Sequence, residues 1–148
     1  MNDNLIITEM ELPERIAFLQ SFIFMIRSDG KIEESEIELI ADLVKIYQIP
    51  KENFSEINQV QKLDHLLEIL KICVKERTHA LFLIKELLTI ANIDNELADS
   101  EIAFVEAVSN ALAIDDDKVL AIHELLMQRM LWLFNNKIVM EYNLSAGE

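Results

Sequence analysis

Glycine and proline are scarce in this sequence, which has two of each among its 148 residues. Two glycines cannot build the glycine-rich loops that cradle phosphate groups or the elbow that presents the nucleophile of many hydrolases. Their scarcity therefore excludes most nucleotide-binding and hydrolase classes. It also removes the residues that most often interrupt helices, while leucine, alanine, glutamate and lysine, which favour helix, are abundant. We expect an all-α fold.

Cysteine and basic residues are also few. The single cysteine, Cys73, cannot form an intramolecular disulfide, and the segment MNDNLIITEM lacks the basic and apolar parts of a secretion signal. We therefore expect a cytoplasmic location. The 13 basic residues face 27 acidic ones, for a formal net charge of −14. This charge repels nucleic acid and anionic membranes and favours cations, or proteins with basic surfaces, as partners.

Apolar residues recur at helical spacing in six segments. Within the second of them, Ile37, Ile40, Ala41 and Val44 form the face that we expect to be buried. A membrane-spanning helix needs about 20 consecutive apolar residues, and charged residues interrupt every apolar run of this sequence before that length. We therefore expect no membrane insertion. The expected architecture is a compact bundle of about six to seven helices in one domain, 1–148. The predicted helices span about 13–27, 33–49, 63–74, 80–91, 102–112 and 118–134.

Two acidic segments of the chain are alike. SDGKIEESE at 28–36 and IDNELADSE at 93–101 align at an offset of 65 residues, and each follows one apolar helix and precedes another. The chain therefore contains two repeated units, about 13–49 and 78–114, each made of a helix, an acidic turn and a second helix. Packed together, two such units could bring their turns face to face.

The acids of the two turns are the candidate functional groups. A two-fold arrangement would bring together Asp29, Glu36, Asp94 and Glu101, and four carboxylates repel one another unless they are protonated or bridged by a cation. The turns match only the second half of an EF-hand loop, because the oxygen ligands of the first half are missing. In the alternative interpretation, these acids only end helices or cap backbone amides.

With these two segments, residues 13–134 resemble the TerB-like family, which is associated with bacterial tellurite resistance. The resemblance implies an all-helical protein in which two acidic helix–turn–helix units bind a divalent metal ion. Carried over to this chain, the metal ligands are Asp29, Glu36, Asp94 and Glu101. In the second copy, Asn95 stands where glycine is usual, and asparagine also tolerates the left-handed backbone conformation. The resemblance further implies a role in a bacterial stress-response or tellurite-resistance-type system.

We expect a non-enzymatic module that binds a divalent metal ion and contacts protein partners. These partners include proteins with basic surfaces and membrane-associated proteins, and a homodimer is one possible assembly. One alternative is a protein-interaction scaffold without a metal site. A carboxylate metalloenzyme is less favoured, because di-metal bundles require pairs of Glu-x-x-His motifs and this sequence has no such pair. Histidine ligands are not expected either, because His65, His79 and His123 are not spaced as a ligand pair. Cys73 is expected in the core.

Overall fold

The computed structural model describes residues 3–29, 33–92, 98–129 and 131. Within these ranges every regular element is helical and no strand occurs, which confirms the all-α fold. Residues 116–129 form the last described helix. The 3-10 helices are η1 (Arg27–Asp29) and η2 (Lys51–Asn53), and the other α-helices are α1 (Asp3–Glu9), α2 (Leu12–Ile26), α3 (Glu34–Ile46), α4 (Phe54–Ile57), α5 (Leu63–Cys73), α6 (Arg77–Ala91) and α7 (Asp99–Ala111).

The helices repeat at the offset found in the sequence. Adding 65 to the bounds of α2 gives the bounds of α6, and adding 65 to those of α3 gives those of α7. The ends of α3 and α7 also match, because Gln48 and Ala113, again 65 apart, both have a positive φ, of 53° and 56°. Each unit therefore has the same two helices at equivalent positions, and the second helix of each unit ends in the same backbone turn.

The helix ends at Gln48 and Ala113 are Schellman motifs. In the first unit, the amide of Ile49 donates to the carbonyl of Val44 at 3.0 Å, and that of Gln48 donates to Lys45 at 3.1 Å. The second unit makes the equivalent bonds after α7. These bonds satisfy carbonyls that a helix end leaves without a partner, and they require the left-handed backbone seen at Gln48 and Ala113.

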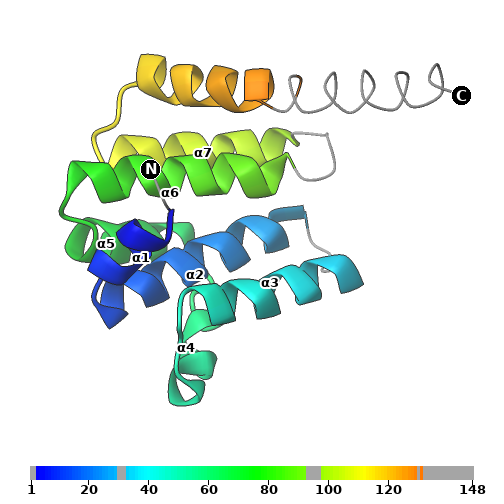
Figure 1. Cartoon of the computed structure of the whole chain (residues 1–148), viewed down its shortest axis with the longest axis vertical. Helices are drawn as coiled ribbons and strands as arrows, with labels where there is room; N and C mark the ends of the chain where they lie inside the picture. The colour runs from blue at the N-terminus through cyan, green and yellow to red at the C-terminus, as the bar shows by residue number, and fades with distance from the viewer. Residues whose placement is uncertain (1–2, 30–32, 93–97, 130, 132–148) are drawn as a thin grey trace, which may run out of the picture.

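Helix α2 lies at the centre of the molecule. It contacts α3, α4, α5 and α6, and its residues Phe18, Leu19 and Phe22 have no exposed surface. In Figure 1, α3 and α2 lie side by side in the lower half, α6 and α7 lie above them, and the helix at 116–129 runs along the top. The four repeated helices thus form the body of the fold, with the two units facing each other across α2 and α6.

The buried face predicted for the second helix is only partly correct. Helix α3 buries Leu43, whereas Ala41 is exposed and Ile37 is 58% exposed. The reason lies in the neighbours of α3. In the second unit, the helix at 116–129 lies beside α7, because its residues Val119 and Leu120 line one cavity together with residues of α7. In the first unit, the corresponding residues, 51–64, form only the short helices η2 and α4 before α5 begins. The first unit therefore has no equivalent long helix to cover α3.

Candidate functional site

Glu36 and Glu101 occupy the same position in α3 and α7, and both cap their own helix. The Glu36 Oε1 atom accepts a hydrogen bond from the Glu33 amide at 2.8 Å. The Glu101 Oε1 atom accepts one from the Ala98 amide at 3.0 Å. A glutamate at this position satisfies an amide that the start of the helix leaves without a partner, and its charge suits the positive end of the helix dipole. The capping role considered from the sequence is therefore present in both turns.

The two glutamates also line one cavity of about 180 Å³. Its wall contains three pairs of residues that are 65 positions apart, one from each unit. Beside it, the Ser28 Oγ atom donates to the Ser100 Oγ atom at 3.4 Å, so the start of the first acidic turn touches the start of α7. The equivalent pairs are Met25 and Ile90, Ile26 and Ala91, and Glu36 and Glu101.

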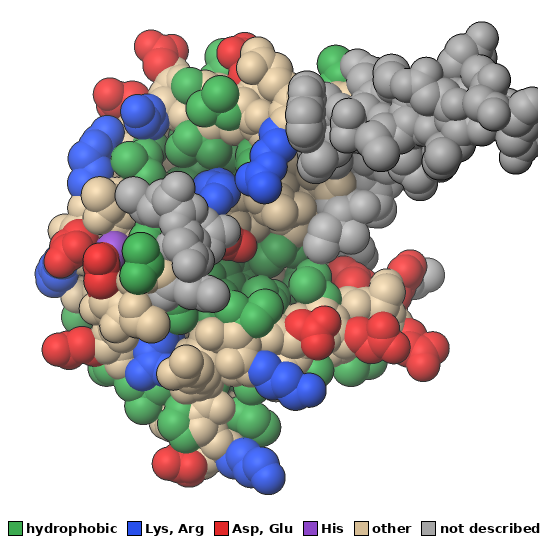
Figure 2. All heavy atoms as spheres, viewed as in Figure 1, with side chains coloured by type: hydrophobic (Ala, Val, Ile, Leu, Met, Phe, Trp, Pro, Cys, Tyr) green, Lys and Arg blue, Asp and Glu red, His purple; other side chains and the backbone are tan. Residues whose placement is uncertain are grey.

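Two of the four predicted metal ligands cannot be placed in this cavity. Asp94 lies outside the described residues, and of Asp29 only the backbone, at the end of η1, is described. The structure therefore brings together the glutamates of the predicted set. Figure 2 shows acidic side chains gathered around the first turn of α3, where Glu33 and Glu34 are exposed beside Glu36.

A second cluster surrounds His79, in the first turn of α6. Its side chain is only 4% exposed, because α1 and the start of α2 pack over this end of α6. Its Nδ1 atom lies 3.1 Å from each carboxylate oxygen of Glu14, a residue of the first turn of α2 whose side chain is 11% exposed. Glu14 and His79 are 65 residues apart, so they are equivalent positions of the two units and lie in contact.

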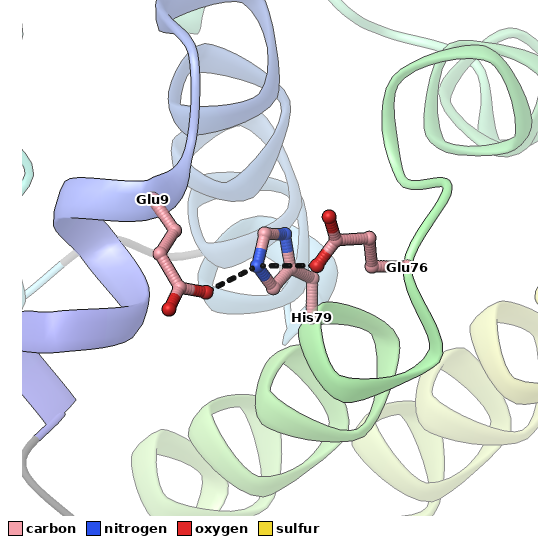
Figure 3. Close-up of side chains that lie close together, drawn as sticks. All are labelled: Glu9, Glu76 and His79. Carbon is pink, nitrogen blue, oxygen red and sulfur yellow. Dashed lines mark hydrogen bonds and ion pairs between the residues drawn. The ribbon is translucent and has the colours of Figure 1, made fainter.

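The other ring nitrogen of His79 faces two further carboxylates. The Nε2 atom lies 3.2 Å from Glu9 Oε2, at the end of α1, and 3.3 Å from Glu76 Oε2, in the residue before α6. Figure 3 shows both contacts, with the imidazole between the two glutamates. One ligand atom from each of the three residues lies within 4.8 Å of the others, as in a group that could hold a metal ion. The glutamate side chains are 60% and 66% exposed.

The surroundings shift the acid–base behaviour of this pair. Burial alone would lower the pKa of His79, but the hydrogen bonds with Glu9 and Glu14 and the charges of Glu14 and Glu76 outweigh it and raise this pKa above its ordinary value. Burial raises the pKa of Glu14, against the opposing effect of His79. Both groups therefore hold their protons more tightly than they do in water.

This cluster lines a surface cavity of about 440 Å³ that Cys73 also lines. Cys73 is half-buried and packs against the edge of the hydrophobic core, and burial raises the pKa of its thiol. The group of ligand atoms that lie within 4.8 Å of one another consists of Glu9, Glu76 and His79 and does not include Cys73. The other titratable groups of the cavity are four carboxylates, one imidazole and the Lys75 amine, and Pro13 and Ile72 complete its lining.

The spacing among the three histidines does not reveal the His79 cluster, but two other signals in the sequence do. Glu76 and His79 form a single Glu-x-x-His motif, which places both side chains on one face at the start of a helix. The repeat places Glu11 and Glu14 opposite them, at the same two positions of the first unit. The sequence therefore lacks the second Glu-x-x-His motif of a di-metal pair, and the one motif that it has contributes to a group that could hold a single ion.

Among the described residues, no helix combines the length and the apolar character needed to cross a bilayer. Comparison of the chain with models of protein families, with curated protein sequences and with solved structures finds no match.

Proposed function

We propose that this chain is a non-enzymatic, TerB-like helical module that binds a divalent cation where its two acidic turns meet. The observation that supports this function is the cavity lined by equivalent residues of both units, Glu36 and Glu101 among them. A role in a stress-response or tellurite-resistance-type system of the bacterial cytoplasm is part of the proposal and follows from the family resemblance.

Helix capping and cation binding are compatible at these two glutamates. A carboxylate has two oxygens with about four lone-pair positions, so a carboxylate that caps a helix can also contact a cation. Carboxylate and hydroxyl oxygens are hard ligands, and the cavity offers both through Glu36, Glu101, Ser28 and Ser35. Such a set suits Ca²⁺, Mg²⁺ or Mn²⁺.

The test is a thermal-unfolding series with these three ions on the double variant Glu36→Gln/Glu101→Gln. Glutamine also serves at this capping position, so the variant keeps the caps and removes only the charges. Saturating Ca²⁺, Mg²⁺ or Mn²⁺ should raise the melting temperature of the wild type, since at 100 times Kd an ion contributes about 2.7 kcal/mol. The double variant should lose this gain and be more stable than the wild type without ions.

The matched control is Asp116→Asn/Asp117→Asn, which removes two exposed charges at the start of the last described helix. This control should keep the full ion-dependent gain. If both double variants respond to the ions alike, the glutamates act only as caps and the turn site is rejected.

A specific observation favours the protein-contact part of the proposal. The face of α3 formed by Ile37, Ile40, Ala41 and Val44 is exposed or half-buried, whereas in α7 the equivalent of Ile40, Val105, is 2% exposed. A row of apolar residues at this spacing fits the apolar face of a partner helix. The exposed acids Glu34, Glu38 and Asp42 flank the row, so the partner helix should be basic.

Binding of a basic amphipathic helical peptide, followed by fluorescence anisotropy, tests this contact. The change Ile37→Glu should abolish binding, while Leu125→Glu, at a leucine that is 66% exposed on another helix, should leave it intact. Unchanged binding by Ile37→Glu would reduce the interaction to charge attraction alone, because an added carboxylate does not weaken attraction to a basic peptide. Light scattering of the free chain tests the homodimer, which the net charge of −14 opposes.

A further inference from the structure

The two ring nitrogens of His79 have different surroundings. Nδ1 lies 3.1 Å from each carboxylate oxygen of the buried Glu14, whereas the two carboxylates that face Nε2 are exposed. We assign the N–H group of the neutral imidazole to Nδ1, because an ionised carboxylate can only accept a hydrogen bond and the buried Glu14 stays in place to accept it. This assignment leaves a lone pair on Nε2, which lies 3.2 Å from the Glu9 oxygen and 3.3 Å from the Glu76 oxygen. A lone pair and two carboxylates repel one another unless a cation lies between them. That cation is either a proton on Nε2 or a metal ion.

We propose that Glu9, Glu76 and His79 form a binding site for one divalent transition-metal ion of the Zn²⁺ class, with Glu14 as the positioning residue. This site lies apart from the acidic turns and does not depend on the function proposed for them. It joins three elements, since α1 supplies Glu9, α2 supplies Glu14 and the start of α6 supplies the other two residues.

The two distances from the imidazole to the carboxylates fit a tetrahedral ion. With metal–ligand bonds of about 2.0–2.1 Å, neighbouring ligand atoms of a tetrahedral Zn²⁺ site lie about 3.3 Å apart. The Nε2 atom of His79 lies 3.2 Å from the Glu9 oxygen and 3.3 Å from the Glu76 oxygen. The glutamates are largely exposed and can adjust around the ion, whereas the buried imidazole is held in place by Glu14. The arrangement is therefore a fixed nitrogen ligand with two adjustable oxygen ligands.

The ligand types decide which ions bind. Imidazole suits Zn²⁺ and its transition-metal neighbours, whereas Ca²⁺ and Mg²⁺ take sets of oxygen ligands. A metal-bound histidine usually donates its other N–H to a carboxylate or carbonyl group, which is the contact that Glu14 makes here. Three protein ligands leave the fourth position of the ion open towards the cavity of about 440 Å³. Water or a small anionic ligand would occupy it.

The competing explanation is a protonated His79 held by three glutamates, with no metal ion. Zn²⁺ and Co²⁺ titrations of the full chain, freed of metal with a chelator, separate the two. Calorimetry reports the affinity and stoichiometry, and the visible absorption of Co²⁺ reports its coordination. The wild type should bind one ion, and Ca²⁺ and Mg²⁺ should not compete at this site.

The ligand variants locate the ion. His79→Gln should abolish the Co²⁺ absorption, and Glu9→Gln/Glu76→Gln should weaken binding at least 100-fold. His65→Gln, at an exposed histidine of α5, and Glu36→Gln/Glu101→Gln, in the acidic turns, should bind as the wild type does. If His79→Gln fails to fold, the Glu9→Gln/Glu76→Gln variant decides, because both of its changes lie at exposed side chains. Absence of Zn²⁺ binding by the wild type, or unchanged binding by that double variant, would overturn the proposal.

The positioning role of Glu14 has a separate readout. Removing a carboxylate that orients a metal-bound histidine typically weakens binding about 10- to 100-fold. Glu14→Ala should therefore weaken Co²⁺ binding and change its absorption spectrum, because the imidazole loses its orientation. Glu14→Gln keeps an acceptor for the Nδ1–H group and should restore the spectrum. The same spectrum in Glu14→Ala and the wild type would contradict the positioning role.

Discussion

At the scale of single residues, the charge of His79 depends on groups from three helical segments. Its pKa is raised by Glu9, Glu14 and Glu76 despite its burial, so the folded chain holds the imidazolium more tightly than the unfolded chain does. The stability that this provides is fully present below the unfolded pKa of about 6.5 and is lost as pH rises through the folded pKa. The titratable groups that line its cavity are Glu9, Glu11, Glu14, Cys73, Lys75 and Glu76.

The metal-free chain should therefore lose free energy of unfolding as pH rises above about 6.5, by at most about 1.4 kcal/mol per pH unit from this one group. Glu14 acts with the same sign, since its raised pKa also gives stability that is lost as pH increases. Denaturant unfolding in the presence of a chelator, between pH 5.5 and 8.5, measures the slope. The variant His79→Gln should flatten it and His123→Gln should not. If the free energy of unfolding has the same pH slope in His79→Gln and in the wild type, His79 is not the group that causes the pH dependence.

Phe22 shows how the core depends on one aromatic side chain. It has no exposed surface and packs edge to face on Phe18 and Tyr47, with ring centroids 6.2 and 5.6 Å away. Phe22→Ala should lower the free energy of unfolding by about 3–5 kcal/mol, because it removes buried apolar surface and leaves a cavity. Phe54→Ala, at a side chain that is 40% exposed, should cost much less in the same denaturant experiment.

At the scale of elements, the ends of α3 and α7 carry strain that glycine would relieve. Ala113 has φ of 56°, in the region where a side chain is unfavourable by about 1–2 kcal/mol. Ala113→Gly should raise the free energy of unfolding by about 1 kcal/mol at this left-handed position. Ala103→Gly, at an exposed site within α7, should instead lower it by about 1 kcal/mol. Thermal unfolding of both variants measures the contrast, and a loss in both would exclude strain at Ala113.

Long helices with regular apolar spacing were predictable from the sequence, and short ones were not. The segment predicted at 63–74 is α5, at Leu63–Cys73, and that predicted at 13–27 is α2, at Leu12–Ile26. Helices α1 and α4 have seven and four residues, too few for a period to show. The exposure of Ile37 could not be predicted, because it depends on which later helix covers α3 and not on the spacing within it.

At the scale of the whole molecule, an excess of 14 negative charges should make stability depend on salt. Self-repulsion of a highly charged chain weakens as the screening length falls, from about 30 Å at 0.01 M salt to about 10 Å at 0.1 M. The metal-free chain should thus melt at a higher temperature in 0.1 M NaCl than in 0.01 M. This increase in melting temperature should be smaller in Glu36→Gln/Glu101→Gln, which carries two fewer negative charges. An unchanged melting temperature in the wild type would show that charge repulsion does not contribute significantly to its stability.

The candidate sites also differ in how far the sequence could predict them. The repeat predicted that the two turns would converge, and Glu36 and Glu101 do line one cavity. The His79 cluster needs three segments that only the packing brings together, since Glu9 is 70 residues from His79. Short-range spacing gives the Glu76 and His79 pair, but the contribution of α1 could be found only in the folded chain.

The contact between Glu14 and His79 has a consequence for how such a chain could arise. In a symmetric dimer of identical half-length chains, a residue on the two-fold axis meets its own copy, so the contact would join two glutamates or two histidines. Two carboxylates repel, and so do two imidazolium groups. An acid facing an imidazole requires the two halves to differ, which a single chain that carries both units allows. The buried pair is therefore a contact that a symmetric dimer of identical half-length chains could not form.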